Sequence, residues 1–188
     1  ATILSQLFYI SGLLIYTKKE LNTINRILLK HNILAITDEV YGDLTYDFDH
    51  TPFATLPGAK KNTLYLDGFS KSYAMTGWRI GYAAGPKDII KAIGKIQSQS
   101  TSNPSSISQA AAVEALNGNQ SFIKKRSKAF KERRNFVVKS LNAINGISCL
   151  TPNGAFYVFP SCKGLLNKKT GLKTDTDFVQ KLLEKSAG

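Results

Sequence analysis

The chain has 188 residues, of which 43% are hydrophobic and 20% charged, and its formal net charge is +12. This length corresponds to one domain, or to one domain with part of a second, and the composition excludes a disordered polar chain. Residues 1–118 carry 11 basic and 9 acidic side chains while residues 119–188 carry 14 basic and 4 acidic ones, which excludes a chain that is basic throughout.

The first predicted element is a helix over residues 18–31. Thr17 and Glu20 have the spacing of a capping box, in which each side chain bonds an end amide of the helix. Asn32 is placed as its C-terminal stop, and the apolar run at residues 33–36 then predicts a short buried strand. The apolar residues at helical spacing are Leu21, Ile24, Ile27 and Leu28.

Two further strands and two helices follow. Short apolar runs at residues 63–66 and 80–84 predict the strands. Pro86 suits the first turn of a helix that carries four isoleucines, and another helix covers residues 106–116 before Asn117 and Gly118 close it. This alternation predicts an α/β domain with a mainly parallel sheet.

The sequence changes character near residue 119, where we place a domain boundary. A long helix over residues 122–144 has an apolar side and basic residues on the rest of its surface. Residues 147–150 and 155–159 resemble a hairpin of strands, and residues 174–186 a final helix. The apolar side of the long helix is Ile123, Phe130, Val137, Leu141 and Ile144.

The basic residues of the long helix allow two interpretations. They could form a nucleic-acid-binding surface, but no interleaved aromatic residues or known binding motif accompany them. A solvated helix face is the preferred interpretation, and steeply salt-dependent DNA binding would be needed to support the other one. The residues concerned are Lys124, Lys125, Arg126, Lys128, Lys131, Arg133 and Arg134.

Cysteine content and hydropathy bear on the cellular compartment. Cys149 and Cys162 are too few for a disulfide scaffold and lack the spacing of a zinc site, which favours reduced thiols in a cytoplasmic protein without a metal. No apolar run reaches the ~18–20 residues needed to cross a bilayer, so no membrane partner is expected. Because the chain begins at Ala1 and ends within a predicted helix, we expect a fragment.

Two segments bring reactive side chains to the carboxyl ends of predicted strands, where ligands of open α/β sheets gather. The first follows the strand at residues 33–36 and contains Asp38 and Tyr41. The second, residues 67–81, holds Lys71 between two serines, with an arginine eight positions on. A lysine held off bulk solvent can lose its proton and form an imine with a carbonyl. The competing interpretations are a surface lysine, an aspartate that caps a turn and a tyrosine in the core.

Residues 68–81 resemble, position by position, the pyridoxal-phosphate attachment motif of class I/II aminotransferases. That motif has a small residue three before the lysine, a glycine six after it and an arginine eight after it. The likeness is to aspartate aminotransferase-like enzymes, runs from about residue 13 to the end, and includes residues 73–82, 85–87 and 152–157. It implies fold type I: residues 1–118 would be the second half of the cofactor-binding large domain. The remainder would be the interdomain helix and the start of a smaller α+β domain.

The resemblance also implies roles for five residues. Lys71 would form the internal aldimine with pyridoxal 5′-phosphate and carry the proton between Cα and the cofactor. Asp38 would keep the pyridine nitrogen protonated, and Tyr41 would donate its hydroxyl to the ring oxygen. Arg79 would bind the phosphate through its planar fork, with Ser70 as a further phosphate ligand.

The chain departs from the family in three respects. Many relatives have a serine where this chain has Gly68, so only a backbone contact with the phosphate is left there. Relatives have an Asn-Pro-x-Gly turn where residues 9–12 read Tyr-Ile-Ser-Gly. This chain therefore lacks the asparagine that contacts the cofactor in relatives. A shifted reading frame over the first dozen residues would account for the difference. Relatives are also longer on both sides, and the additional parts would supply a ring that stacks on the cofactor and the arginine that binds the substrate carboxylate.

The implied reaction is transfer of an amino group from an amino acid, first of all aspartate, to a 2-oxo acid such as 2-oxoglutarate. Relatives are homodimers, and residues 100–106 are expected near the dimer interface. Two alternatives stay open: another pyridoxal-phosphate reaction on the same scaffold, such as β-elimination or action on an aromatic or alanine substrate, and a catalytically inactive remnant of a split gene.

Overall fold

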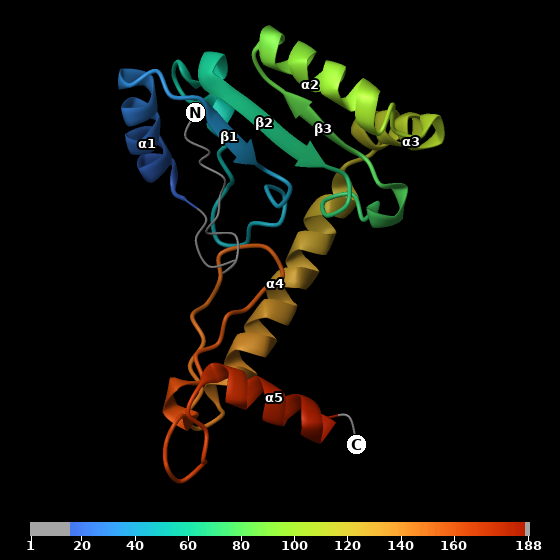
Figure 1. The fold of residues 1–188 in the computed structure, drawn as a ribbon. Coiled ribbons are helices and arrows are strands. Elements are labelled where there is room, and N and C mark those ends of the chain that lie inside the picture. Colours follow the sequence, from blue (N-terminus) through green and yellow to red (C-terminus); the bar gives the residue numbers. More distant parts are fainter. Residues whose placement is uncertain (1–15, 187–188) are drawn as a thin grey trace.

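The computed structural model describes residues 16–186, which form a three-stranded sheet with helices around it and a long helix that leads away from it (Figure 1). The sheet has the order β1-β2-β3; β1 and β2 run parallel, and β2 and β3 antiparallel. The elements follow one another in the predicted order, so the α/β class is confirmed, while the three-stranded sheet is mixed, with one parallel and one antiparallel pair rather than mainly parallel. The strands are β1 Ala35–Asp38, β2 Thr63–Gly68 and β3 Gly81–Ala84. The α-helices are α1 Lys18–Lys30, α2 Lys87–Ser100, α3 Ser106–Asn117, α4 Ser121–Asn142 and α5 Asp175–Ser186. Short 3-10 helices are η2 Phe53–Thr55, η3 Ala59–Asn62, η4 Thr76–Trp78 and η5 Lys163–Leu165.

The capping box defines the start of α1. The Thr17 amide donates to Glu20 Oε2 at 2.7 Å, and the Glu20 amide donates to Thr17 Oγ1 at 3.3 Å. The helix buries Leu21 and Leu28 in a hydrophobic cluster beneath β1 and the 3-10 helices. After the helix, Asn32 takes the left-handed conformation, with φ of 49°, as expected for a helix stop.

The first strand begins two residues later than predicted. β1 starts at Ala35, because the Ile33 amide still donates to the Leu28 carbonyl at 2.9 Å and so belongs to the turn that closes α1. The strand ends at Asp38, where the sequence predicts its end. The helices predicted for the sequence after β3 form within a few residues of their expected bounds.

The predicted hairpin after α4 is wrong. Residues 147–150 and 155–159 form no strands, and a single antiparallel bridge joins Ser148 to Ser161. Hydrogen bonds to the loop after β1 take the place of hairpin pairing: the Ala155 amide donates to the Leu44 carbonyl at 2.8 Å, and the Tyr46 amide donates to the Asn153 carbonyl at 2.9 Å. These bonds carry the segment toward the sheet.

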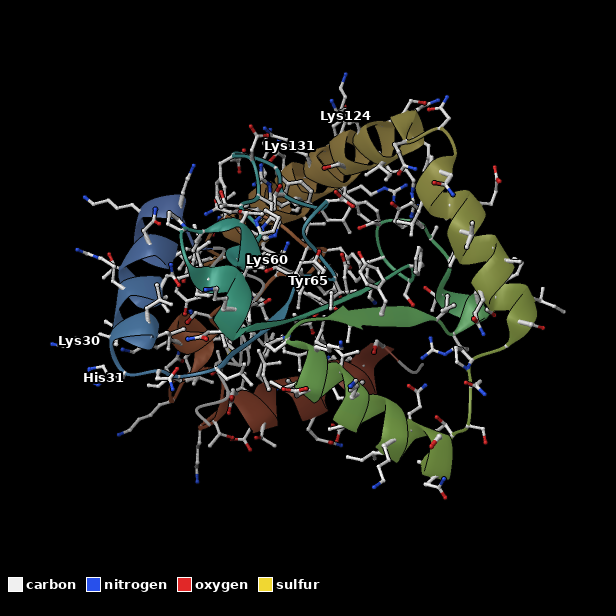
Figure 2. The ribbon with its side chains drawn as sticks, turned by 90° about the horizontal axis from the view of Figure 1, so that it is seen from above. Lys30, His31, Lys60, Tyr65, Lys124 and Lys131 are labelled. Carbon is white, nitrogen blue, oxygen red and sulfur yellow. The ribbon has the colours of Figure 1, made fainter. Side chains whose placement is uncertain are left out.

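Helix α4 uses some of its basic residues to hold this arrangement (Figure 2). Lys131 projects from α4 and donates to the Tyr46 carbonyl at 3.0 Å. Arg134 is buried and donates both to Asp47 Oδ2 at 2.5 Å and to the Pro152 carbonyl at 2.6 Å. Lys124 is exposed. The predicted solvated face therefore describes Lys124 but not Arg134.

The apolar side predicted for α4 needs a related correction. The helix buries Arg134 and Val138, whereas Val137, which was predicted to be covered, is 37% exposed. The buried face of α4 therefore contains Arg134, whose guanidinium pairs with Asp47 in the loop after β1. No helix in residues 16–186 is both long and apolar enough to cross a bilayer.

The first prediction concerns the cap of α1. Thr17→Ala is expected to lower the free energy of unfolding by about 1 kcal/mol, because it leaves an end amide of the helix without its side-chain acceptor. Urea unfolding followed by circular dichroism measures the change. Thr23→Ala is the matched control, since Thr23 lies inside the helix, where its hydroxyl donates to the Lys19 carbonyl and accepts from Arg26, and it caps no end amide. An equal loss in both variants would contradict the capping role.

The second prediction concerns the acid sensitivity of the Arg134–Asp47 pair. The hydrogen bond from Arg134 lowers the pKa of Asp47 to about 2, against about 3.9 in an unfolded chain. A lowered pKa in the folded state stabilises the fold above pH ~4, and this contribution is lost as the pH falls toward ~2. Because the Asp47 side chain is 37% exposed, solvent screening limits the contribution to about 1 kcal/mol.

Asp47→Asn is therefore expected to be less stable than the unchanged chain at neutral pH and to lose less stability between pH ~4 and ~2. Urea unfolding at a series of pH values measures both quantities. Asp49→Asn is the control, because Asp49 lies two residues away and forms no ion pair with any residue of 16–186. The idea fails if the two variants show the same pH dependence.

Candidate functional site

The parallel pairing of β1 with β2 brings the two reactive segments to one edge of the sheet. Asp38, the last residue of β1, is in register with Leu66 of β2, and β2 ends two residues later at Gly68. Lys71 follows three residues further along the chain. Asp38 is exposed, while its neighbour Glu39 is buried, so successive side chains leave β1 on opposite sides.

The loop between β2 and β3 carries Lys71. It is closed by hydrogen bonds, and two of its other residues have strained backbone conformations. The Ala74 amide donates to the Lys71 carbonyl at 3.2 Å, and Thr76 Oγ1 donates to the Ser70 carbonyl at 2.9 Å. Ala74 and Arg79 both have positive φ, of 56° and 51°. Non-glycine residues rarely adopt this conformation, and such strain concentrates at functional sites. The loop is therefore a rigid platform for its lysine.

The amine of Lys71 lies over two neighbouring aromatic rings. Its Nζ is 5.5 Å from the centroid of the Tyr41 ring and 5.0 Å from that of Phe156. At these distances each ring face attracts the ammonium group. The rings of Tyr41 and Phe156 also meet edge to face, with centroids 5.4 Å apart, so the lysine has a defined place at the end of the sheet.

Tyr41 is a protonated phenol in this setting. Its ring is buried, and its hydroxyl forms a 2.6 Å hydrogen bond with the hydroxyl of Tyr157. Burial raises the pKa of Tyr41 well above its ordinary value, and the hydrogen bond with Tyr157 and the negative charge of Asp38 act in the same direction. The hydroxyl therefore keeps its proton at neutral pH and can donate it in a hydrogen bond.

The predicted site residues divide into two groups. Asp38, Tyr41 and Lys71 come together. The Tyr41 ring contacts the amine of Lys71, and the negative charge of Asp38 raises the pKa of Tyr41. Ser70 and Arg79 lie in the same loop as Lys71, so the backbone brings them near the lysine. The guanidinium of Arg79 donates to the Thr76 carbonyl at 2.9 Å. No contact found in residues 16–186 joins their side chains to the lysine amine. The predicted departure at residues 9–12 lies outside the described residues.

Sequence reasoning missed two residues at this site, Phe156 and Tyr157. Both belong to the family likeness at residues 152–157, but the likeness implies no role for either of them. Nothing in their spacing places them beside a lysine 85 positions earlier in the chain. A signal was present all the same, because two aromatic residues after Asn153 and Gly154 fit a turn that presents large side chains.

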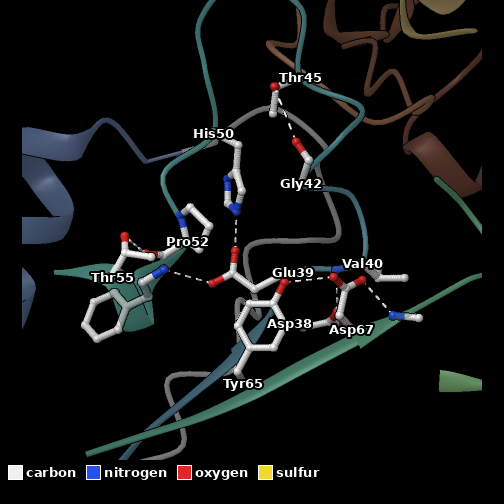
Figure 3. A network of polar contacts seen from close by, with 12 residues as sticks. Asp38, Glu39, Val40, Gly42, Thr45, His50, Pro52, Thr55, Tyr65 and Asp67 are labelled. Atoms are coloured by element: carbon white, nitrogen blue, oxygen red, sulfur yellow. Dashed lines mark hydrogen bonds and ion pairs between the residues drawn. The ribbon is translucent and has the colours of Figure 1, made fainter. Parts of the chain in front are cut away.

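A second polar network lies next to Asp38 (Figure 3). The carboxylate of the buried Glu39 accepts hydrogen bonds from His50 Nε2 and from the Phe53 amide, which ties down the loop after β1. Nearby, Asp67 accepts a hydrogen bond from the hydroxyl of Tyr65 at 2.8 Å. Burial raises the pKa of Asp67 above its ordinary value. These residues fix the geometry around Asp38 and have no contact with the amine of Lys71 in the described part of the chain.

The sequence and fold are similar to those of known aminotransferases. The sequence model of the family described as "Aminotransferase class I and II" matches residues 14–187. An aspartate aminotransferase of Rhizobium meliloti (strain 1021) is 49% identical over 176 residues, which are 90% of this chain and 43% of the relative. A probable aspartate/prephenate aminotransferase of Rhizobium leguminosarum bv. phaseoli is 51% identical over 176 residues, which are 90% of this chain and 44% of the relative.

Solved structures extend the comparison. The crystal structure of an aspartate aminotransferase from Rhizobium meliloti superposes with a TM-score of 0.88 at 46% identity, covering 97% of this chain and 47% of that chain. A Thermus thermophilus aspartate aminotransferase mutant gives a TM-score of 0.86 at 32% identity, covering 97% of this chain and 48% of that chain. The chain thus spans less than half the length of each of these relatives.

Proposed function

Because the chain belongs to the class I and II aminotransferase family, we propose that it serves pyridoxal-phosphate-dependent transamination, with Lys71 as the residue that carries the cofactor. The observation that supports this proposal most directly is the place of Lys71. It projects from a strained loop at the sheet edge that also carries Asp38, and its amine lies over the rings of Tyr41 and Phe156.

The donor set of the site fits the cofactor that this family uses. When bound, pyridoxal phosphate supplies an aldehyde that reacts with amines and a ring that accepts electrons from the substrate's Cα. Lys71 offers the amine. Asp38 is exposed, forms no ion pair within residues 16–186, and offers a carboxylate to a protonated ring nitrogen. Tyr41 offers a phenolic proton and Arg79 a guanidinium for the phosphate.

Each of these residues has a separate task. Lys71 would hold the cofactor through its amine, and the same amine would move the proton to and from the substrate's Cα. Asp38 would keep the ring nitrogen protonated by its negative charge, and Tyr41 would bind the ring oxygen. Arg79 would bind the phosphate with its planar guanidinium, whose shape a lysine cannot match. Ser70 would add a hydroxyl for the same group.

Two paired glycines differ in the space around them. A Cβ added at Gly68 would meet its nearest atoms at 3.6 Å, an ordinary contact, so a small side chain fits there. A Cβ at its strand partner Gly81 would lie 2.9 Å from the Asp67 carbonyl, where only glycine fits. The glycine at position 81 thus lets β3 lie close against β2.

Aspartate is the amino donor that we propose first, with a 2-oxo acid such as 2-oxoglutarate as acceptor. The names of the relatives support aspartate, and one of them also names prephenate. The second candidate is a chain without activity of its own. We also retain as predictions the division at residue 119, a homodimer with residues 100–106 near its interface, and a cytoplasmic location.

The third prediction tests the cofactor site directly. The purified chain is mixed with pyridoxal phosphate, reduced with borohydride and digested, and the modified lysine is located by mass spectrometry. Labelling is expected predominantly at Lys71 and is expected to disappear in Lys71→Ala. Lys60→Ala is the control, since Lys60 is an exposed lysine of η3 (Figure 2). Labelling spread evenly over surface lysines would refute the cofactor site and favour the inactive chain.

The fourth prediction tests the phosphate ligand. Arg79→Lys keeps the positive charge but loses the planar fork, so labelling of Lys71 by pyridoxal phosphate at limiting concentration is expected to fall about tenfold. Pyridoxal, which lacks the phosphate, should label the variant and the unchanged chain equally. A parallel loss with both compounds would mean that the substitution disturbs the loop rather than phosphate binding.

A further inference from the structure

Two buried side chains at the end of β1 lie on the side of the strand away from Asp38. Side chains alternate along a strand, and the Glu39 amide still bonds the Leu66 carbonyl of β2 at 2.8 Å, so Thr37 and Glu39 share this side. Thr37 is only 6% exposed, and its hydroxyl oxygen has no hydrogen-bond partner within residues 16–186. Buried polar side-chain atoms nearly always have a partner in the protein or in ordered water, so this hydroxyl requires an explanation.

A small cavity adjoins this side of the strand. Its volume is about 30 Å³, and its lining combines polar and apolar side chains. A polar cavity needs about 10–15 Å³ to hold a water molecule, whereas pockets for organic ligands measure about 300 Å³ or more. The cavity therefore has room for water but not for an amino acid or a cofactor. Its lining residues include Thr37, Glu39, His50, Leu21 and Phe53.

The carboxylate of Glu39 can accept a further hydrogen bond in this cavity. Its oxygens already accept from His50 Nε2 (Figure 3) and from the Phe53 amide, the second at 3.1 Å. A carboxylate has about four acceptor sites and no proton to donate, so a molecule that joins it to Thr37 must donate to it. Water can do so while it accepts the proton of the Thr37 hydroxyl. The hydroxyl of Thr51, which lines the same cavity, offers a third partner.

A threonine of the neighbouring strand shows what Thr37 lacks. Thr63, the first residue of β2, is 1% exposed, and its hydroxyl donates to the Ala59 carbonyl at 2.9 Å. A hydroxyl that is removed from solvent without such an acceptor lowers the stability of the fold. A water molecule in the cavity gives Thr37 a partner and removes this loss.

We propose that the cavity is a binding site for one ordered water molecule, which accepts from the Thr37 hydroxyl and donates to the Glu39 carboxylate. The water connects β1 to the hydrogen bonds by which Glu39 ties down the following loop. Buried water with several polar partners is part of a protein's structure and is costly to remove. The inference stands apart from the proposed function, because the site lies on the side of β1 away from Asp38.

A crystal structure of the chain at a resolution that shows ordered water tests the site directly. One water molecule is expected within about 3.0 Å of both Thr37 Oγ1 and a Glu39 carboxylate oxygen. A cavity without density, or a direct bond from Thr37 to a protein acceptor, would overturn the proposal. Anomalous scattering at the site after a soak in rubidium chloride would overturn it too, because the occupant would then be a monovalent cation.

Thr37→Val tests the same hydrogen bond in solution, because valine keeps the shape of threonine without the hydroxyl. Its urea unfolding midpoint is expected to fall, since the variant leaves the water with one partner fewer. Thr63→Val is the matched control, because it removes a buried hydroxyl that has a protein acceptor, and its midpoint should also fall. If the midpoint of Thr37→Val rises or stays unchanged while that of the control falls, the hydroxyl has no partner and the proposal fails. The crystal structure of the unchanged chain decides the question if the variant does not fold.

Discussion

The buried guanidinium of Arg134 is the interaction on which the arrangement of the site depends. It donates to Asp47 in the loop after β1 and to the carbonyl of Pro152, and the remainder of its side chain belongs to α4. Three separate parts of the chain are thereby joined at one point. A buried charge is costly unless it is paired and hydrogen-bonded, so removal of any of these partners would leave an uncompensated charge. The chain just after Pro152 is therefore held against the sheet edge.

This anchor explains how the site is assembled from distant segments. Tyr41 follows β1, Lys71 follows β2, and Phe156 follows the segment that Arg134 holds. Conformations that are rare in non-glycine residues occur at Ala74, in the loop of the lysine, and at Ala155, which precedes Phe156. Strain of this kind persists only where surrounding contacts enforce it. The hydrogen bonds of the lysine loop and the contacts of Ala155 supply that enforcement.

Helices α2 and α3 expose large apolar side chains, and the relatives of this chain are longer than the part that it covers. Helix α2 has no buried residue, and its Ile96 is 70% exposed; Ile107 at the start of α3 is 71% exposed. The relatives are more than twice as long as the part that this chain covers. The fold of the matching part is nonetheless retained, as the TM-score of 0.88 against the Rhizobium meliloti structure shows.

The sequence by itself determined the local elements and the identity of the reactive residues. The capping box of Thr17 and Glu20, the stop at Asn32 and the spacing around Lys71 depend on contacts between near neighbours in the chain, so their patterns can be read without coordinates. Only the tertiary structure decided that residues 153–155 bond to the loop after β1 rather than form a hairpin, and that Tyr157 meets Tyr41. Those choices depend on which of several possible backbone and hydroxyl partners is nearest once α4 has been positioned by Arg134, and no periodicity in the sequence records that distance.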